Sequence, residues 1–147
     1  FLAILLFFSN CGYTPIFSKK DINFSIENIE FLGDENVNGK ISKALYSYRD
    51  KRDQKKKISL VINSIKNITI DSKNSKGEAH TNKISIDTKV RIILDVNNFI
   101  EKSFGRSTIY SVIDRKSELQ SIENKLIENL SNEIALQIIF EILKNTK

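Results

Sequence analysis

The chain has 147 residues, of which 40% are hydrophobic and 28% charged, and its formal net charge is +5. This length supports one compact core but is short for two, so we expect a single domain. Basic residues alternate with acidic and amide residues along nearly the whole chain, which argues against the contiguous basic patch of a nucleic-acid-binding protein.

Residues 1–8 form an uncharged apolar run, directly followed by Ser9, Asn10 and Cys11. The run is far shorter than the roughly 20 residues that a membrane-spanning helix needs, and it is typical of the hydrophobic part of a secretion signal. Because the chain has no methionine, we expect its true start, with the basic part of the signal, to lie upstream. Residues 1–10 are therefore predicted to be the C-terminal part of a lipoprotein signal peptide.

Cys11 is the only cysteine, so it cannot form an internal disulfide bond. A cysteine directly after such a run is where diacylglycerol is attached through a thioether. Phe8 and Asn10 depart from the usual lipobox, which has leucine and a small residue at these positions. The alternative is that the run is a buried strand and the cysteine an inert core thiol. We favour lipid attachment at Cys11, with a lipidated tether over residues 11–20 and one periplasmic domain over 21–147.

The domain begins with a predicted strand and helix. Apolar residues alternate from Asp21 and change phase at Ile29, which indicates a bulge or bend. Helical spacing then predicts an amphipathic helix of about 15 residues from Val37, capped by Asp34 or Asn36. The densest basic stretch, residues 49–57, contains Asp50, Asp53 and Gln54 and is interpreted as a solvated helix end and loop, in preference to a binding patch.

Two further strands are predicted on either side of a turn at residues 71–77. The first alternates from Ile58 and continues to Ile70. The second is the clearest strand of the chain, with one apolar face and one polar face, as in an antiparallel sheet. Its apolar face is predicted to hold Ile84, Ile86, Val90, Ile92, Leu94 and Val96, and its polar face Ser85, Asp87, Lys89, Arg91 and Asp95.

A fourth strand and a long helix complete the pattern. After a turn at residues 97–98, alternation from near Lys102 predicts the strand, and an amphipathic helix follows from Lys116. Residues 134–143 of this helix are apolar almost all round, so they are expected either to lie deep in the core or to meet a partner. The apolar stripe of the helix comprises Leu119, Ile122, Leu126, Leu130, Ile134, Ile138 and Ile142.

These elements predict an α+β fold. A four-stranded, mostly antiparallel sheet with two helices packed on one face, in the order β-α-β-β-β-α, is the simplest arrangement that buries every apolar stripe. The residues of a catalytic or metal site are not recognisable in the sequence, and the one histidine, His80, is interpreted as an ordinary loop residue. We therefore expect a binding protein that is not an enzyme and that needs no cofactor or metal.

The start of the mature chain, Cys11-Gly-Tyr-Thr-Pro-Ile-Phe17, resembles the Cys-Gly-Phe-x-Pro-Leu-Tyr start of the alphaproteobacterial LptE family of lipopolysaccharide-assembly lipoproteins. The stretch from Gly77 to Ile86, the motif Ser103-Phe-Gly-Arg106 and the order of elements are also similar. The resemblance implies an outer-membrane lipoprotein that faces the periplasm, plugs the LptD β-barrel, and assists barrel assembly and the insertion of lipopolysaccharide into the outer leaflet.

The family also binds lipopolysaccharide through basic side chains, but no motif transfers those residues to this chain. From the sequence alone, Lys89 and Arg91 are the best candidates, because they share the wet face of the clearest strand and could meet phosphates there. Lys83 and Arg106 come next. The alternative interpretation is that all four are solubilising charges on an exposed face.

Two other functions remain open. The chain could be an accessory lipoprotein subunit of another envelope transport system, which only the identity of its partner would distinguish. A cytosolic nucleic-acid binder would require the N-terminal run to be core, and the sequence offers no stacking platform of aromatic side chains for it. We therefore expect no nucleic-acid partner.

Overall fold

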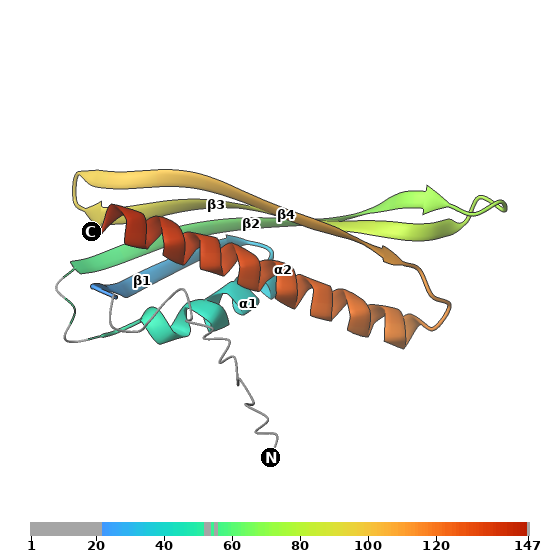
Figure 1. Ribbon diagram of the computed structural model, residues 1–147, viewed down its shortest axis with the longest axis horizontal. Coiled ribbons are helices and arrows are strands. Elements are labelled where there is room, and N and C mark those ends of the chain that lie inside the picture. Colours follow the sequence, from blue (N-terminus) through green and yellow to red (C-terminus); the bar gives the residue numbers. More distant parts are fainter. Residues whose placement is uncertain (1–21, 52–53, 55, 147) are drawn as a thin grey trace, which may run out of the picture.

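The computed structural model describes residues 22–51, 54 and 56–146. The predicted signal segment 1–10, Cys11 and the tether 11–20 lie outside these residues. The element order is the predicted β-α-β-β-β-α (Figure 1). The elements are β1 (Phe24–Gly33), α1 (Glu35–Leu45), the 3₁₀ turn η2 (Tyr46–Tyr48), β2 (Lys56–Lys73), β3 (Ala79–Asp95), β4 (Asn98–Ser111) and α2 (Lys116–Asn145).

The strands form one sheet in the order β1-β2-β3-β4. β1 runs parallel to β2, and the other two pairs are antiparallel, which confirms the mostly antiparallel sheet. The predicted bulge is present, because the pairing of β1 with β2 shifts between Ile26 and Asn28. The hairpin of β2 and β3 is long, and Figure 1 shows its turn extending beyond the other elements.

Both helices cover the same face of the sheet. α1 contacts β1 and β2, α2 contacts β3 and β4, and the two helices pack against each other. The core between the layers is built largely from branched aliphatic side chains, with the aromatic rings of Phe24 and Tyr48 stacked at its edge. Neither helix of the described chain is long and apolar enough to cross a membrane.

The link from β1 to α1 depends on two residues. Gly33 has a φ of +86°, which favours glycine, and it turns the chain into the helix. Asp34 is the N-cap: its side chain accepts a hydrogen bond from the backbone N–H of Val37 at 3.0 Å, and it pairs with Lys66 at 3.1 Å. Partial burial works to raise the pKa of Asp34, but these two interactions hold it below its ordinary value.

The first helix differs in extent from the prediction. α1 begins at Glu35 and has 11 residues, not about 15 from Val37. The 3₁₀ turn η2 follows it directly. The chain then returns to the sheet, where Arg49 forms an isolated bridge with Ile26.

The turn between β3 and β4 corrects two expectations. Val96 was expected on the buried face, but it is 91% exposed, because β3 ends at Asp95 and Val96 lies in the turn. β4 begins at Asn98, which pairs with Asp95, and not near Lys102. Phe99 and Ile100 are adjacent apolar residues, so they break the alternation at the start of β4 and the sequence pattern indicates a strand only from near Lys102.

The apolar last third of α2 is buried on one side and exposed on the other. Ile134, Ile138 and Ile142 are fully buried against the sheet, as expected of the core interpretation. Leu136 and Phe140 are exposed, because they point away from the sheet. The stripe nearer the start of the helix is only half-buried, since α2 extends there beyond α1 (Figure 1).

Candidate ligand-binding face of the sheet

The face of the sheet opposite the helices carries three of the four predicted ligand-binding residues. Along β3, buried and exposed residues alternate, so Lys83, Lys89 and Arg91 point away from the helices and are exposed. Within the part of the chain that the structure describes, no helix packs on this face. We call it the open face.

Lys89 and Arg91 come together in one shallow groove. The groove has a volume of about 480 Å³, and its walls come from all four strands. Cross-strand pairing places Lys89 between Asn63 and Ser103. Its full lining is Leu32, Val61, Asn63, Lys89, Val90, Arg91, Glu101, Lys102 and Ser103.

Arg91 is already engaged within the fold. Its Nε and Nη2 atoms donate hydrogen bonds of 2.8 and 2.6 Å to Oε1 of Glu101, its cross-strand partner. Its guanidinium carbon also lies 5.1 Å from the centre of the Phe99 ring. A guanidinium held in this way is largely neutralised, so binding a phosphate would require it to exchange or share Glu101.

Lys83 and Arg106 line a second depression, of about 340 Å³, together with Asp87. Arg106 does not share the phase of the open face, because it pairs with buried Ile86. Its Nε donates to Glu133 of α2 at 3.1 Å, and its Nη1 to the carbonyl of Gly105 at 2.8 Å. Arg106 therefore links the edge strand β4 to α2.

The two lysines differ from the two arginines in whether a carboxylate pairs with them. Among the described residues, no carboxylate forms an ion pair with Lys83 or Lys89, whereas Arg91 and Arg106 each have one. The two ammonium groups are six residues apart on β3, about 20 Å at roughly 3.3 Å per residue. The open face can therefore offer two separated cationic groups to a large anionic ligand, and Arg91 as a third after exchange.

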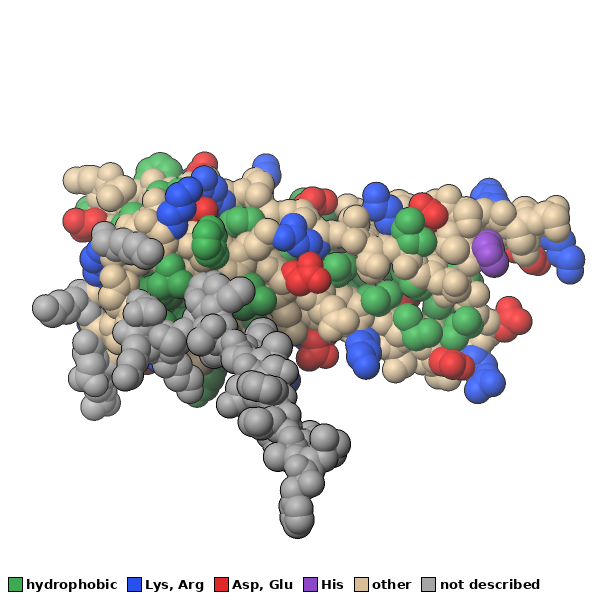
Figure 2. All heavy atoms as spheres, viewed as in Figure 1, with side chains coloured by type: hydrophobic (Ala, Val, Ile, Leu, Met, Phe, Trp, Pro, Cys, Tyr) green, Lys and Arg blue, Asp and Glu red, His purple; other side chains and the backbone are tan. Residues whose placement is uncertain are grey.

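Sequence reasoning missed Glu101, which neutralises Arg91. Glu101 stands beside Arg91 only through the β3–β4 register, which depends on the position of the turn at Val96, whereas Asp87 lies on the predicted polar face of β3 itself. Figure 2 shows basic and acidic side chains interspersed along the visible surface, as the sequence predicts. His80, which was interpreted as a loop residue, instead lies exposed at the start of strand β3, and its carbonyl accepts a hydrogen bond from the N–H of Val112.

No family model matches the chain, and no curated protein matches it in sequence. Several solved structures are similar in fold. Rare lipoprotein B from Shewanella oneidensis has a TM-score of 0.58 and 10% identity, over 81% of this chain and 96% of that one. An uncharacterized lipoprotein B from Nitrosomonas europaea has a TM-score of 0.59 and 12% identity, over 85% and 88%. A minor lipoprotein from Acinetobacter baumannii has a TM-score of 0.56 and 14% identity, over 81% and 92%. The chain therefore has the fold of these bacterial lipoproteins.

Proposed function

We propose that the protein is a lipid-anchored outer-membrane lipoprotein that partners an LptD-like β-barrel, assisting its assembly and the insertion of lipopolysaccharide. The observation that carries the proposal is the fold, which this chain shares with rare lipoprotein B over nearly the whole length of that protein. The resemblance of residues 11–17 to the start of the LptE family supports it. The apolar run and Cys11 supply the anchor that such a protein needs.

The open face fits a partner with polar walls. The lumen of a membrane β-barrel is polar, because its lipid-facing and lumen-facing side chains alternate. The open face presents interspersed cations, carboxylates and hydroxyls, including Lys83, Asp87 and Ser107. Its long axis follows the 18 residues of β2, about 60 Å at roughly 3.3 Å per residue, so an elongated partner surface is favoured.

The cations of the open face suit the phosphates of lipopolysaccharide. Lys83 and Lys89 need give up no carboxylate of the described chain to bind phosphate, and Arg91 could offer a bidentate contact after exchange. This part of the proposal is tested by lipopolysaccharide binding to the double variant Lys83→Glu and Lys89→Glu. We expect a loss of binding of at least about tenfold, since each reversal adds repulsion.

The matched control reverses two exposed lysines away from the open face, Lys43 on α1 and Lys76 in the β2–β3 turn. It changes the net charge equally. Equal losses in the two double variants would reduce the interaction to net charge alone and remove the open face as the binding site.

The partner is tested by affinity purification of the full lipoprotein, tagged at its C-terminus, after gentle solubilisation of its host's membranes. Stoichiometric recovery of one large outer-membrane barrel protein is expected. The protein with Cys11→Ser is the control, because it loses the anchor while keeping every described contact. Recovery of an inner-membrane transport complex would contradict the proposal and favour an accessory subunit of another envelope system.

A further inference from the structure

The end of the molecule where β1 begins brings four elements together. The side-chain amide of Asn23 donates to the carbonyl of Thr146 at 2.8 Å, and Lys56 donates to the same carbonyl. The start of β2, the end of α2 and Asn98 at the start of β4 line one hollow of about 440 Å³. Figure 1 shows this turn and the C-terminus at the same end of the molecule.

Two large apolar side chains are exposed at this end. Val96 is 91% exposed in the turn, and Phe99 is 56% exposed at the start of β4. Turn tips normally carry polar residues, and Asp95, Asn97 and Asn98 follow that rule. The valine is the exception, and no described residue shields it.

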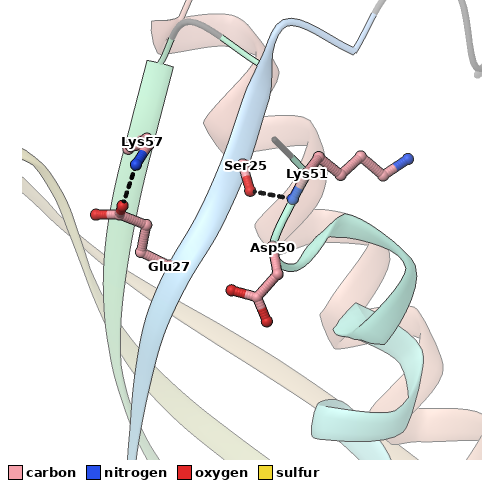
Figure 3. A pocket seen from close by; sticks show the side chains of 5 residues that line it. All are labelled: Ser25, Glu27, Asp50, Lys51 and Lys57. Atoms are coloured by element: carbon pink, nitrogen blue, oxygen red, sulfur yellow. Dashed lines mark hydrogen bonds and ion pairs between the residues drawn. The ribbon is translucent and has the colours of Figure 1, made fainter. Parts of the chain in front are cut away.

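Lysines lie at the same end of the molecule as this apolar pair. Lys56 and Lys57 line the same hollow as Asn98, and residues 49–57 hold six basic and two acidic residues in sequence, a formal charge of +4. Lys57 forms an ion pair with Glu27, with 2.7 Å between Nζ and Oε1. Figure 3 shows this pair and the side chain of Lys51, which extends away from the other labelled residues. Exposed apolar groups beside basic ones are typical of surfaces that enter the interface of an anionic membrane.

The length of chain between Cys11 and Ile22 limits how far this end of the domain can lie from a lipid on Cys11. Ten residues lie between Cys11 and Ile22, so the eleven residue steps from Cys11 to Ile22 span at most about 40 Å at roughly 3.6 Å per residue. A lipid on Cys11 would therefore keep the start of β1 within about 40 Å of the bilayer, whereas the β2–β3 turn lies at the opposite end of the 18-residue strand β2.

We propose that Val96, Phe99 and the lysines Lys51, Lys56 and Lys57, together the anchored end, dock onto the headgroup layer of the membrane that holds the lipid. The inference rests on the lipid anchor of the proposed function and adds a contact surface to it. Val96 and Phe99 enter the interface while the lysines meet anionic headgroups, so the body of the protein is held end-on to the membrane.

The test uses tryptophan as a probe, because the chain contains none. Residues 22–146 hold every described element and the core, so we expect a protein that begins at position 11, with Cys11→Ser, to fold without the signal segment. The variant Val96→Trp is mixed with vesicles of phosphatidylethanolamine and phosphatidylglycerol. We expect its fluorescence to shift to the blue, and the shift to vanish at high salt or with phosphatidylcholine alone.

Ile109→Trp is the matched control, because Ile109 is 54% exposed on the same strand and face as Phe99 but lies at the other end of β4. Its fluorescence should not respond. In a sedimentation assay, Val96→Ser with Phe99→Ser should weaken vesicle binding about tenfold, whereas Ile70→Ser with Ile109→Ser should leave it unchanged.

Equal responses of the two tryptophan probes, or none from Val96→Trp, would overturn the inference. A Val96→Trp probe that ignores vesicles but responds in a purified complex with a barrel protein would assign the anchored end to that partner instead. Since the vesicle assay uses protein without lipid or partner, its failure is distinguishable from a failure to recover a barrel protein.

Discussion

The two faces of the sheet are built from the same strands by opposite rules. The face under the helices holds fully buried aliphatic side chains such as Leu60, Ile62 and Ile86. The open face mixes cations, carboxylates and hydroxyls with exposed apolar side chains such as Ile65 and Ile109, and Arg91 and Glu101 form an ion pair on it. The difference teaches that the covered face specifies the fold, while the open face is free to vary with the partner.

This comparison predicts very different costs for neighbouring residues of β3. Ile86→Ala removes a fully buried side chain and leaves a cavity, so we expect a loss of about 3 kcal/mol in the free energy of unfolding. Asp87→Ala, one residue along on the open face, should change it by less than about 0.5 kcal/mol. Urea unfolding of both variants measures this, and similar losses would refute the division between faces.

The next effect concerns the link from β1 to α1. A Cβ at Gly33 would lie 2.1 Å from the carbonyl oxygen of Ser64, and φ is positive there. Gly33→Ala should therefore cost about 3 kcal/mol. Gly39→Ala is the control: nothing lies within 4 Å of its Cβ, and it stands inside α1. It should stabilise the protein by up to about 1 kcal/mol, since alanine favours helix; if it destabilised the protein instead, our account of α1 would be wrong.

Tyr110 tests the contribution of a polar contact at the edge of the covered face. Its hydroxyl donates to Glu123 of α2 at 2.5 Å. Burial, and then this bond, raise its pKa to about 12. Tyr110→Phe should cost about 1.5 kcal/mol. The tyrosine's contribution is present below its ordinary pKa near 10 and is lost as the pH rises from 10 to 12. Unfolding titrations of both proteins should converge over that window, and a constant difference would contradict the assignment.

Asp34 acts in the opposite pH direction. Asp34→Ala removes the cap of α1 and the partner of Lys66, at a cost of about 1 kcal/mol. Because the folded pKa is lowered, the contribution is present above the unfolded pKa near 4 and is lost as the pH falls through the folded value. Thermal unfolding at neutral and acidic pH checks this, with Glu35→Ala as a first-turn control. A difference that persists at low pH would exclude the carboxylate as its source.

The smallest expected effect lies on the open face itself. Arg91→Ala breaks an ion pair whose side chains are both more than half exposed, so stability should fall by less than about 1 kcal/mol. The paired variant Glu101→Ala should instead raise affinity for lipopolysaccharide, because it frees the guanidinium for phosphate. Weaker binding after Glu101→Ala would show that the ion pair orders Arg91 for its ligand.

The sequence predicts the layers because alternation and helical spacing record which side chains are buried. The bulge near Ile29 and the cap at Asp34 follow from the same local signals. Val96 and Arg106 escape prediction for a shared reason: their environment depends on where β3 turns into β4 and on what packs beside the edge strand. Both depend on tertiary structure, as does the pairing of Arg91 with Glu101.

The most direct test of the proposed partnership is photo-crosslinking in the living host. A photoreactive amino acid replaces Ser107, which is exposed on the open face of β4, in the full lipoprotein with its anchor. We predict one dominant product that contains a large outer-membrane barrel protein. Products confined to inner-membrane or soluble periplasmic proteins would contradict the proposal that the open face meets a barrel.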